Sequence, residues 1–176
     1  MILKRIQRLV SGGPFYVRIR PQMLSVRDIN AKRTIEDMPL MAITRGDNRS
    51  ILAIGASAAT EASTSRKEYE LINGFDHPRS IISDFTVAEK TLQYFFRKLV
   101  RNKMLRPSPI VVMHVLDKIE GGLTQVEVRA LQELAAGAGA REAYVWTGRE
   151  LIDHEFESKQ FPGNHWFPEQ PKWAKT

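Results

Sequence analysis

Two neighbouring stretches decide the fold: Thr86-Val-Ala-Glu-Lys-Thr-Leu-Gln-Tyr-Phe-Phe-Arg-Lys-Leu99 and, after the break at Arg106-Pro-Ser-Pro109, Ile110-Val-Val-Met-His-Val115. The first has apolar residues at helical spacing. Thr86 and Glu89 stand at the spacing of a capping box, which predicts a helix beginning at Thr86. The second is continuously apolar, which is typical of a strand buried on both faces in a parallel sheet. The expected core stripe of the helix comprises Ala88, Leu92, Phe95, Phe96 and Leu99.

The same alternation continues downstream. Thr124-Gln-Val-Glu127 has capping-box spacing and opens a second predicted helix, with Gly139 as a plausible residue just past its end. Glu142-Ala-Tyr-Val-Trp146 is the next expected strand. The expected buried stripe of this helix comprises Val128, Leu131, Leu134, Ala135 and Ala138.

Upstream, short β-branched or aromatic runs separated by turn formers predict an antiparallel meander. The runs cover residues 15–19, 24–29, 39–43 and 51–54. Residues 55–73 are rich in Ala, Ser, Thr and charge and favour a small polar helical excursion, closed by His77-Pro78. Strands first, followed by strand and helix in alternation, indicate an α/β domain with a mixed sheet.

Composition excludes several classes of function. The 176 residues contain 43% apolar residues and no cysteine, which leaves one domain with a real core and rules out disulfides, thiolate metal sites and cysteine nucleophiles. The net charge is +6, but residues 1–33 alone carry +7, so the rest is about neutral. Such a distribution favours a basic anchor over a nucleic-acid groove, and a soluble basic face is the alternative. No run approaches the ~20 apolar residues that a spanning helix needs.

The first ten residues predict a basic amphipathic helix. Its apolar stripe faces away from its cations, and Ser11-Gly12-Gly13-Pro14 ends it. An interfacial membrane anchor has this composition, and a terminal helix packed on its own domain is the alternative. The candidate membrane-binding residues are Ile2, Leu3, Lys4, Arg5, Ile6 and Leu9.

These motifs, taken in order, resemble the MreB family of bacterial actin homologues. The resemblance covers residues 1–151 and rests on Met1-Ile-Leu-Lys-Arg-Ile6, Asp84-Phe-Thr-Val-Ala-Glu-Lys-Thr-Leu-Gln-Tyr-Phe95, Arg106-Pro-Ser-Pro109, Thr124-Gln-Val-Glu127 and Ala136-Gly-Ala-Gly-Ala-Arg-Glu142. MreB-like proteins share the actin fold, in which two halves clasp ATP and Mg²⁺. The resemblance therefore implies an α/β, actin-like (ribonuclease-H-like) subdomain I with a mixed sheet, and we expect the second half of the actin fold to be missing.

The family's nucleotide-handling motifs are not matched. Its first phosphate loop, Asp-Leu-Gly-Thr, aligns with Arg18-Ile-Arg-Pro-Gln22, which has no carboxylate or glycine and contains a proline without an amide. Its Glu-Glu-Pro, which carries the carboxylate thought to position the attacking water, aligns with Thr147-Gly148-Arg149. We expect no catalytic residue, no cofactor and no ATP hydrolysis, although Arg18 and Arg20 could attract phosphate as point charges. Four scattered histidines predict no metal site, and His114, inside the apolar strand, is expected to be a hydrogen-bonded core residue.

The helix that opens at Thr124 also carries a candidate protein interface. Val126 lies about 200° from Val128 around the helix, on a face away from the core stripe. Local packing at the helix start would explain an apolar residue there, but the resemblance implies the antiparallel pairing surface of MreB-like filaments. The candidate interface residues are Thr124, Val126, Glu127, Ala130 and Glu133.

The expected organisation has three parts: residues 1–13 as membrane-binding helix and linker, 14–151 as the MreB/actin-like domain, and 152–176 as a flexible tail rich in proline and aromatics. Aromatic residues of the tail could instead fold back over the cleft side of the domain, namely Phe161, Trp166, Phe167 and Trp173. The expected partners are full-length MreB or a second copy, and the inner face of the cytoplasmic membrane, with no nucleic acid and no metal. The expected location is cytoplasmic and membrane-peripheral, and a phosphate-binding module or a decayed paralogue are the rival interpretations.

Overall fold

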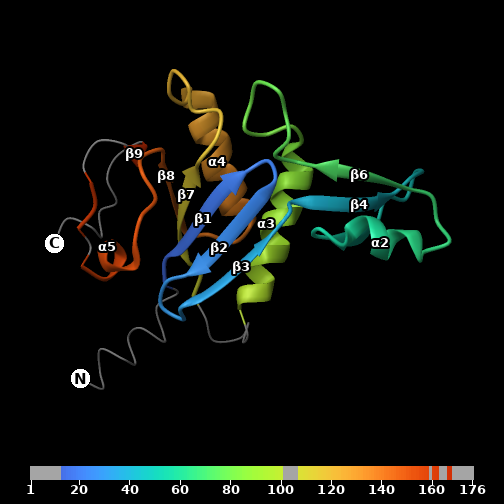
Figure 1. Ribbon diagram of the computed structural model, residues 1–176, viewed down its shortest axis with the longest axis horizontal. Coiled ribbons are helices and arrows are strands. Elements are labelled where there is room, and N and C mark those ends of the chain that lie inside the picture. Colours follow the sequence, from blue (N-terminus) through green and yellow to red (C-terminus); the bar gives the residue numbers. More distant parts are fainter. Residues whose placement is uncertain (1–12, 101–106, 159, 163–165, 168–176) are drawn as a thin grey trace.

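The computed structural model describes residues 13–100, 107–158, 160–162 and 166–167. Its main sheet is mixed, in the order β3-β2-β1-β7-β8-β9 (Figure 1). Strand β1 pairs antiparallel with β2 and parallel with β7, and β7 pairs parallel with β8. The α/β class with a mixed sheet is thus confirmed. The strands are β1 Phe15–Arg20, β2 Met23–Asp28, β3 Arg33–Asp37, β7 Ile110–Val115, β8 Glu142–Trp146 and β9 Trp166–Phe167.

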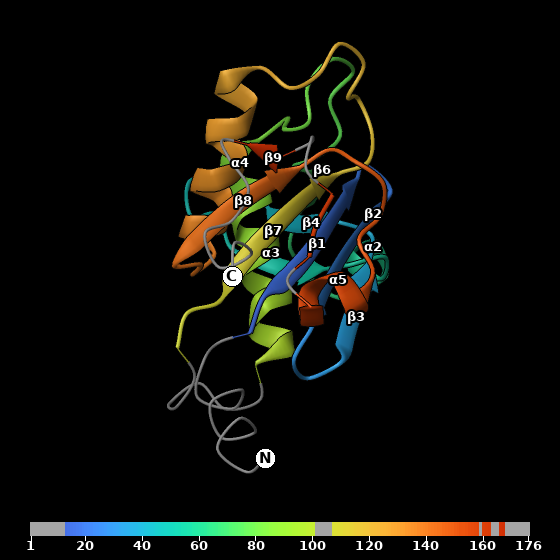
Figure 2. The same ribbon diagram turned by 90° about the vertical axis from the view of Figure 1, so that its left-hand side faces the viewer.

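Helices α3 (Phe85–Leu99) and α4 (Gln125–Gly137) cover one face of this sheet. Figure 2 shows α3 behind the sheet. The expected stripe of α3 is buried throughout, and in α4 all members of the expected stripe are buried except Ala138, which is half-buried. Every residue of β7 is buried, as its continuous apolar run predicted. The core therefore lies between the two helices and the sheet.

The predicted start of α3 at Thr86 is wrong. Asp84 is the N-cap, with extended backbone angles, and its Oδ1 accepts a hydrogen bond from the backbone N–H of Val87 at 3.0 Å. Asp84 takes this position because a carboxylate is also a favoured cap and lies one residue before Phe85, the first helical residue. The second box is confirmed, because Thr124 Oγ1 accepts from Glu127 N and the Glu127 carboxylate accepts from Thr124 N. Gly139, at φ +107°, follows α4 as expected.

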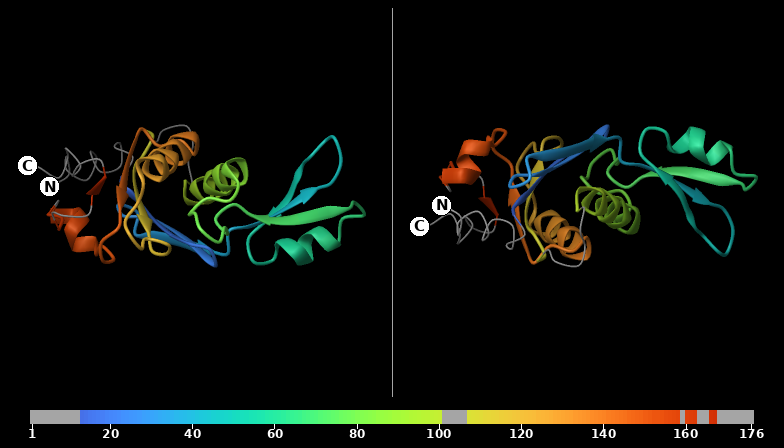
Figure 3. Two further views of the ribbon diagram at one scale, coloured as in Figure 1. Left: turned by 90° about the horizontal axis from the view of Figure 1, so that it is seen from above. Right: turned by 90° about the horizontal axis from the view of Figure 1, so that it is seen from below.

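The predicted single meander is divided between two sheets. A small antiparallel sheet, in the order β5-β4-β6, projects from the domain beside helix α2 (Figure 3). The small polar helical excursion expected within residues 55–73 is present as a short helix, but a strand that was not predicted follows it. The elements are β4 Leu40–Thr44, β5 Ile51–Ile54, α2 Ala58–Ser63 and β6 Tyr69–Asn73. Asp37 stabilises the crossing between the sheets, because its Oδ1 accepts from the backbone N–H groups of Met38 and Ala56 at 2.7 and 2.8 Å.

The opposite face of the main sheet is covered by the segment after β8. Helix α5 (Asp153–Ser158) lies in front of the sheet in Figure 2, and Leu151 and Phe156 are buried with Tyr16 and Trp146. This packed segment differs from the expectation of a flexible tail from residue 152. Phe161, half-buried, contacts Phe156 edge-on at 5.3 Å between ring centroids. The structure thus has helices on both faces of one sheet.

Three of the expectations concern parts of the chain outside the described residues. These are the amphipathic helix at residues 1–10, Trp173, and the remainder of the tail beyond residue 167. Within the described ranges, no helix has the length and apolar character needed to cross a membrane.

Candidate functional site

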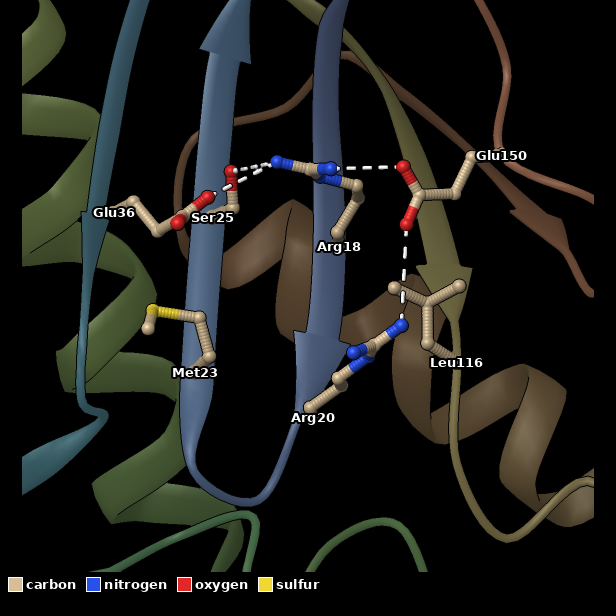
Figure 4. Close-up of a pocket in the computed structure, with 7 residues that line it drawn as sticks. All are labelled: Arg18, Arg20, Met23, Ser25, Glu36, Leu116 and Glu150. Carbon is tan, nitrogen blue, oxygen red and sulfur yellow. Dashed lines mark hydrogen bonds and ion pairs between the residues drawn. The ribbon is translucent and has the colours of Figure 1, made fainter.

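The position of the expected phosphate loop is an open hollow of about 290 Å³ at the carboxyl ends of the parallel strands. Ligands of open α/β sheets bind at this edge. Arg20 is the last residue of β1, Leu116 comes directly after β7, and Glu150 lies in the loop after β8 (Figure 4). The lining is completed by Arg18 of β1, Met23 and Ser25 of β2 and Glu36 of β3. The fold therefore places a hollow where the family resemblance implies a nucleotide.

Side chains of the hollow are already paired with one another. The Arg18 guanidinium donates to Glu150 Oε2 at 2.9 Å, to Glu36 Oε2 at 3.0 Å and to Ser25 Oγ at 3.0 Å. Arg20 lies 3.9 Å from the other oxygen of Glu150. The two guanidinium and two carboxylate charges cancel, so the hollow is formally neutral. An anion that approached Arg18 would also face the two carboxylates that already pair with its guanidinium, and their negative charge would oppose its binding.

The turn beside the hollow is a hairpin and not a phosphate cradle. Residues 21 and 22 form the tight turn between β1 and β2, and Arg20 pairs directly with Met23. Pro21 is buried and has no N–H, and its carbonyl oxygen accepts from Asn73 Nδ2 at 2.6 Å. This turn therefore lacks the run of converging backbone donors that a phosphate site uses.

The loop after β8, which begins with the three residues aligned with the family's Glu-Glu-Pro, is fixed to the sheet by a buried network. His114 Nε2 lies 2.8 Å from the Gly148 carbonyl oxygen, and His114 Nδ1 lies 2.5 Å from Tyr16 Oη. A carbonyl can only accept, so Nε2 carries the proton and Nδ1 accepts from the Tyr16 hydroxyl. Tyr16 Oη in turn accepts from the backbone N–H of Leu151 at 3.0 Å.

Burial sets the protonation states of this network. It lowers the pKa of His114 to about 4, and it raises the pKa of Tyr16 to about 12. Both side chains are therefore neutral near pH 7, as the hydrogen-bond pattern requires. The expectation that His114 is a hydrogen-bonded core residue is confirmed, and its 0% exposure keeps it from any ligand.

The end of this loop is joined to α5 by an ion pair. Arg149 Nη1 donates to Glu155 Oε2 at 3.1 Å, and Glu155 also accepts from the Ile152 N–H at 2.8 Å. Burial alone would raise the pKa of Glu155, but the hydrogen bonds from Arg149 and Ile152 together lower it. Arg27 forms a second ion pair with Asp153 of α5. The residue aligned with the family's proline thus has a structural role.

Among the described residues, no three His, Asp or Glu side chains are grouped so that they could hold a metal ion. His77 accepts from the backbone N–H groups of Arg79 and Ser80 at 3.1 and 3.0 Å and so closes a local turn.

The candidate interface lies on the outer face of α4. Val126 is 78% exposed, whereas Val128, two residues on, is 8% exposed and part of the core. Thr124 and Glu133 are exposed, and Glu127 and Ala130 are half-buried. Local packing at the helix start therefore does not explain Val126. Thr124 and Glu127 serve the capping box, and Glu133 pairs with Arg129 at 2.7 Å.

Sequence reasoning missed the partners of Arg18. Glu36 belongs to a strand that was not predicted, and Glu150 lies in the loop after β8, 132 positions away from Arg18 in the sequence. Strand pairing could have revealed Ser25, because it stands directly opposite Arg18 in the register of β1 and β2. Ion pairs between residues that are far apart in the sequence and not paired in a strand register leave no such signal in one sequence.

The architecture defines the class of protein. The chain has the actin-like fold: it superposes on the crystal structure of MreB5 of Spiroplasma citri bound to ADP with a TM-score of 0.59 and 18% identity, covering 76% of this chain and 37% of that one. It superposes on the MamK double helical filament with a TM-score of 0.54 and 11% identity, covering 76% of this chain and 41% of that one. These likenesses show the fold alone.

The family follows from sequence comparison. The model of the MreB/Mbl protein family matches residues 29–150, and this chain belongs to that family. The cell shape-determining protein MreB of Pasteurella multocida is 40% identical over 100 residues, which are 57% of this chain and 27% of that protein. The chain thus matches less than a third of that relative's length.

Proposed function

We propose that this chain is an MreB-like cytoskeletal protein of cell-shape determination that binds or modulates MreB filaments without hydrolysing ATP. Exposure of Val126 carries the proposal. An aliphatic side chain that is 78% exposed on a helix whose opposite face is buried has no role in the fold of the chain itself. Such a residue is suited to the centre of a contact between proteins.

The kind of partner follows from the relatives. The matched curated relative is a cell shape-determining protein, and MamK, which shares the fold, assembles into a double helical filament. An isologous contact uses the same patch on both chains, so pairing through α4 requires only the part of the molecule present here. A second copy or a full-length MreB is therefore the proposed partner.

Replacing Val126 with glutamate tests this proposal. The new carboxylate would have to be desolvated at the contact, so self-association or binding to a full-length MreB is expected to weaken at least about 100-fold, equivalent to about 2.7 kcal/mol. Analytical ultracentrifugation and pull-down measure the two interactions. Because Val126 is exposed, the thermal melt should remain cooperative and shift little.

Two results would contradict the proposal. If the Val126→Glu variant bound its partner with unchanged affinity, the proposed contact through Val126 would be refuted. If the variant lost its cooperative melt, Val126 would be shown to belong to the core. Met23→Glu is the matched control, because Met23 is also exposed and apolar but lies on β2 beside the hollow. This control should bind as the unaltered chain does.

We also propose that the chain lies at the inner face of the cytoplasmic membrane. The proposal is supported by the cations that gather at the end of the domain formed by the β2–β3 turn and the carboxyl end of α3. The β2–β3 turn and the carboxyl end of α3 meet there, since Arg33 donates to the carbonyl oxygens of Leu99 and Lys98 at 2.9 and 3.5 Å. Lys32 and Arg97 add exposed cations at the same end. Cations near anionic lipid headgroups favour binding by about 1 kcal/mol each.

Deleting residues 2–10 is expected to reduce co-sedimentation with anionic liposomes at least about tenfold, because it removes the predicted apolar stripe and three cations. Ile2→Ser with Leu3→Ser should reproduce most of the loss, and Gln7→Ser, on the polar side, should not. Unchanged sedimentation of the deletion variant would refute the anchor.

A further inference from the structure

We propose that two acids of α5, Asp153 and Glu157, compete with anionic lipid headgroups for Arg27 and Lys32, and thereby hold back binding of this chain to the membrane. The inference rests on the proposed membrane location, because it concerns the regulation of the same end of the domain. It is carried by the ion pairs that join α5 to β2 and to the turn after β2.

Helix α5 lies on the face of the sheet to which Arg27 belongs. Arg27 stands directly opposite Tyr16 in the register of β1 and β2, so the two side chains share one face of the sheet. The ring of Tyr16 packs against Phe156 of α5 at 5.3 Å between centroids. Figure 2 shows α5 in front of the sheet on this face. The helix therefore covers the sheet beside the cations of the β2–β3 end.

Each carboxylate of α5 is paired with a cation. Asp153 forms an ion pair with Arg27, and Glu157 Oε1 lies 3.6 Å from Lys32 Nζ. The third acid of the helix pairs with Arg149 in the loop just before it. Two of the three pairs thus reach from α5 to β2 and to the β2–β3 turn, where the proposed membrane-facing cations lie.

These two ion pairs can open while α5 stays on the sheet. The side chains of Asp153 and Glu157 are 34% and 43% exposed, whereas Phe156, which holds the helix on the sheet, is buried. Among the described residues, the buried Nε of Arg27 has no hydrogen-bond partner, so its pairing with α5 leaves part of the guanidinium unsatisfied. Exposed pairs of this kind contribute little to stability, and an anionic headgroup can therefore displace them.

The competition follows from the signs of the charges. Lipid phosphates and the α5 carboxylates are both anionic acceptors, so a donor that serves one is withdrawn from the other. The carboxylates also repel an anionic surface directly. Arg27 and Lys32 therefore become fully available to lipid only when the two acids turn away or lose their charge.

Neutralising the two acids in the full chain tests the inference. Asp153→Asn/Glu157→Gln should bind liposomes of phosphatidylglycerol and phosphatidylcholine in equal parts about fivefold more tightly, which is roughly what one fully available cation contributes at an anionic surface. Liposomes of phosphatidylcholine alone should show no such gain. Asp47→Asn/Glu68→Gln is the matched control, since it makes the same charge change at exposed positions of the projecting small sheet, and its gain should stay below about twofold. Co-sedimentation measures all four.

Removing the cations shows whether the acids act through them. Arg27→Gln/Lys32→Gln should bind the anionic liposomes about fivefold more weakly, and adding the two acid substitutions to it should then change the affinity by less than about twofold. If the acids gave the same fivefold gain with and without the cations, they would act by repulsion alone, and the competition would be overturned. Glu157→Gln by itself changes only an exposed pair, so it should keep a cooperative melt and give about a twofold gain even if the double acid variant does not fold.

The outcomes separate this inference from the proposed membrane location. If the unaltered chain sediments with anionic liposomes and the acid variants bind no more tightly than it does, the location stands and the competition is wrong. If neither the unaltered chain nor the acid variants sediment with anionic liposomes, the location is overturned and the inference with it.

Discussion

Mg-ATP at about 1 mM is expected to raise the melting temperature of the chain by no more than about 2 °C. We expect a dissociation constant for Mg-ATP that is millimolar or weaker, and a constant of about 1 mM corresponds to about 0.4 kcal/mol of stabilisation at this concentration. A micromolar site with a dissociation constant of about 10 μM would add about 2.7 kcal/mol and raise the melting temperature of a chain of this size by about 5–10 °C. Differential scanning fluorimetry distinguishes the two.

The physical reason is the pairing of Arg18 with Glu36 and Glu150. A triphosphate entering the hollow would face both carboxylates and would have to displace one of them from the guanidinium. Pro21, in the hairpin turn, has no N–H to offer in exchange. Replacing both glutamates with glutamine would leave Arg18 and Arg20 as unopposed cations.

The Glu36→Gln/Glu150→Gln variant therefore serves as the control for the assay. It should bind phosphate or ATP more tightly than the unaltered chain, although still without the specificity of a cradle. Calorimetry that gave micromolar ATP affinity for the unaltered chain would contradict the prediction. It would also favour the rival interpretation of a small phosphate-binding module.

The core of the fold could be predicted from the sequence because its signals are local and redundant. Helices α3 and α4 show apolar residues at a period of 3.6, and β7 shows a continuous apolar run. The helical pattern arises because one face of each helix is removed from water, and the continuous run arises because both faces of β7 are removed from water. Burial of the expected stripes, from Ala88 to Leu99 and from Val128 to Ala135, confirms that reasoning.

Two edge strands, β3 and β6, escaped prediction for a related reason. Strand β3 reads Arg-Thr-Ile-Glu-Asp and has no buried residue, so its sequence shows no alternation between an apolar and a polar face. Strand β6 is likewise only partly buried. Their positions follow from pairing with β2 and β4, and pairing is a property of the assembled sheet.

The hollow shows where reasoning from one sequence ends. The mismatches at the expected phosphate loop were visible as residue types, but the neutralisation of Arg18 was not. Glu150 is 132 positions away from Arg18 in the chain, and Glu36 is 18 positions away. The packing of α5 was missed for a similar reason, since Phe156 belongs to a stretch too short to show periodicity.

Acid is expected to destabilise the chain through His114 between about pH 6.5 and pH 4. The folded state holds this imidazole neutral because burial lowers its pKa to about 4, whereas the unfolded chain protonates it near the ordinary value of 6.5. Between these values the unfolded state binds more protons, so stability increases with pH. The contribution is fully present above pH 6.5, and it is lost progressively down to pH 4, by up to about 3 kcal/mol.

Urea unfolding at pH 7, 6, 5 and 4 measures this dependence, and His114→Phe is the variant that removes it. The variant is expected to be less stable at pH 7, because the hydroxyl of Tyr16 and the carbonyl of Gly148 lose their partner, but its stability should vary less between pH 6.5 and 4.5. Glu155, whose pKa is lowered, contributes mainly below that window. His154→Asn is the control, since it removes a histidine whose side chain is exposed. If the folded unaltered chain showed a His114 ring titration near pH 6.5 by NMR, or if the histidine and phenylalanine forms had the same slope, the buried neutral imidazole would not be the source of acid sensitivity.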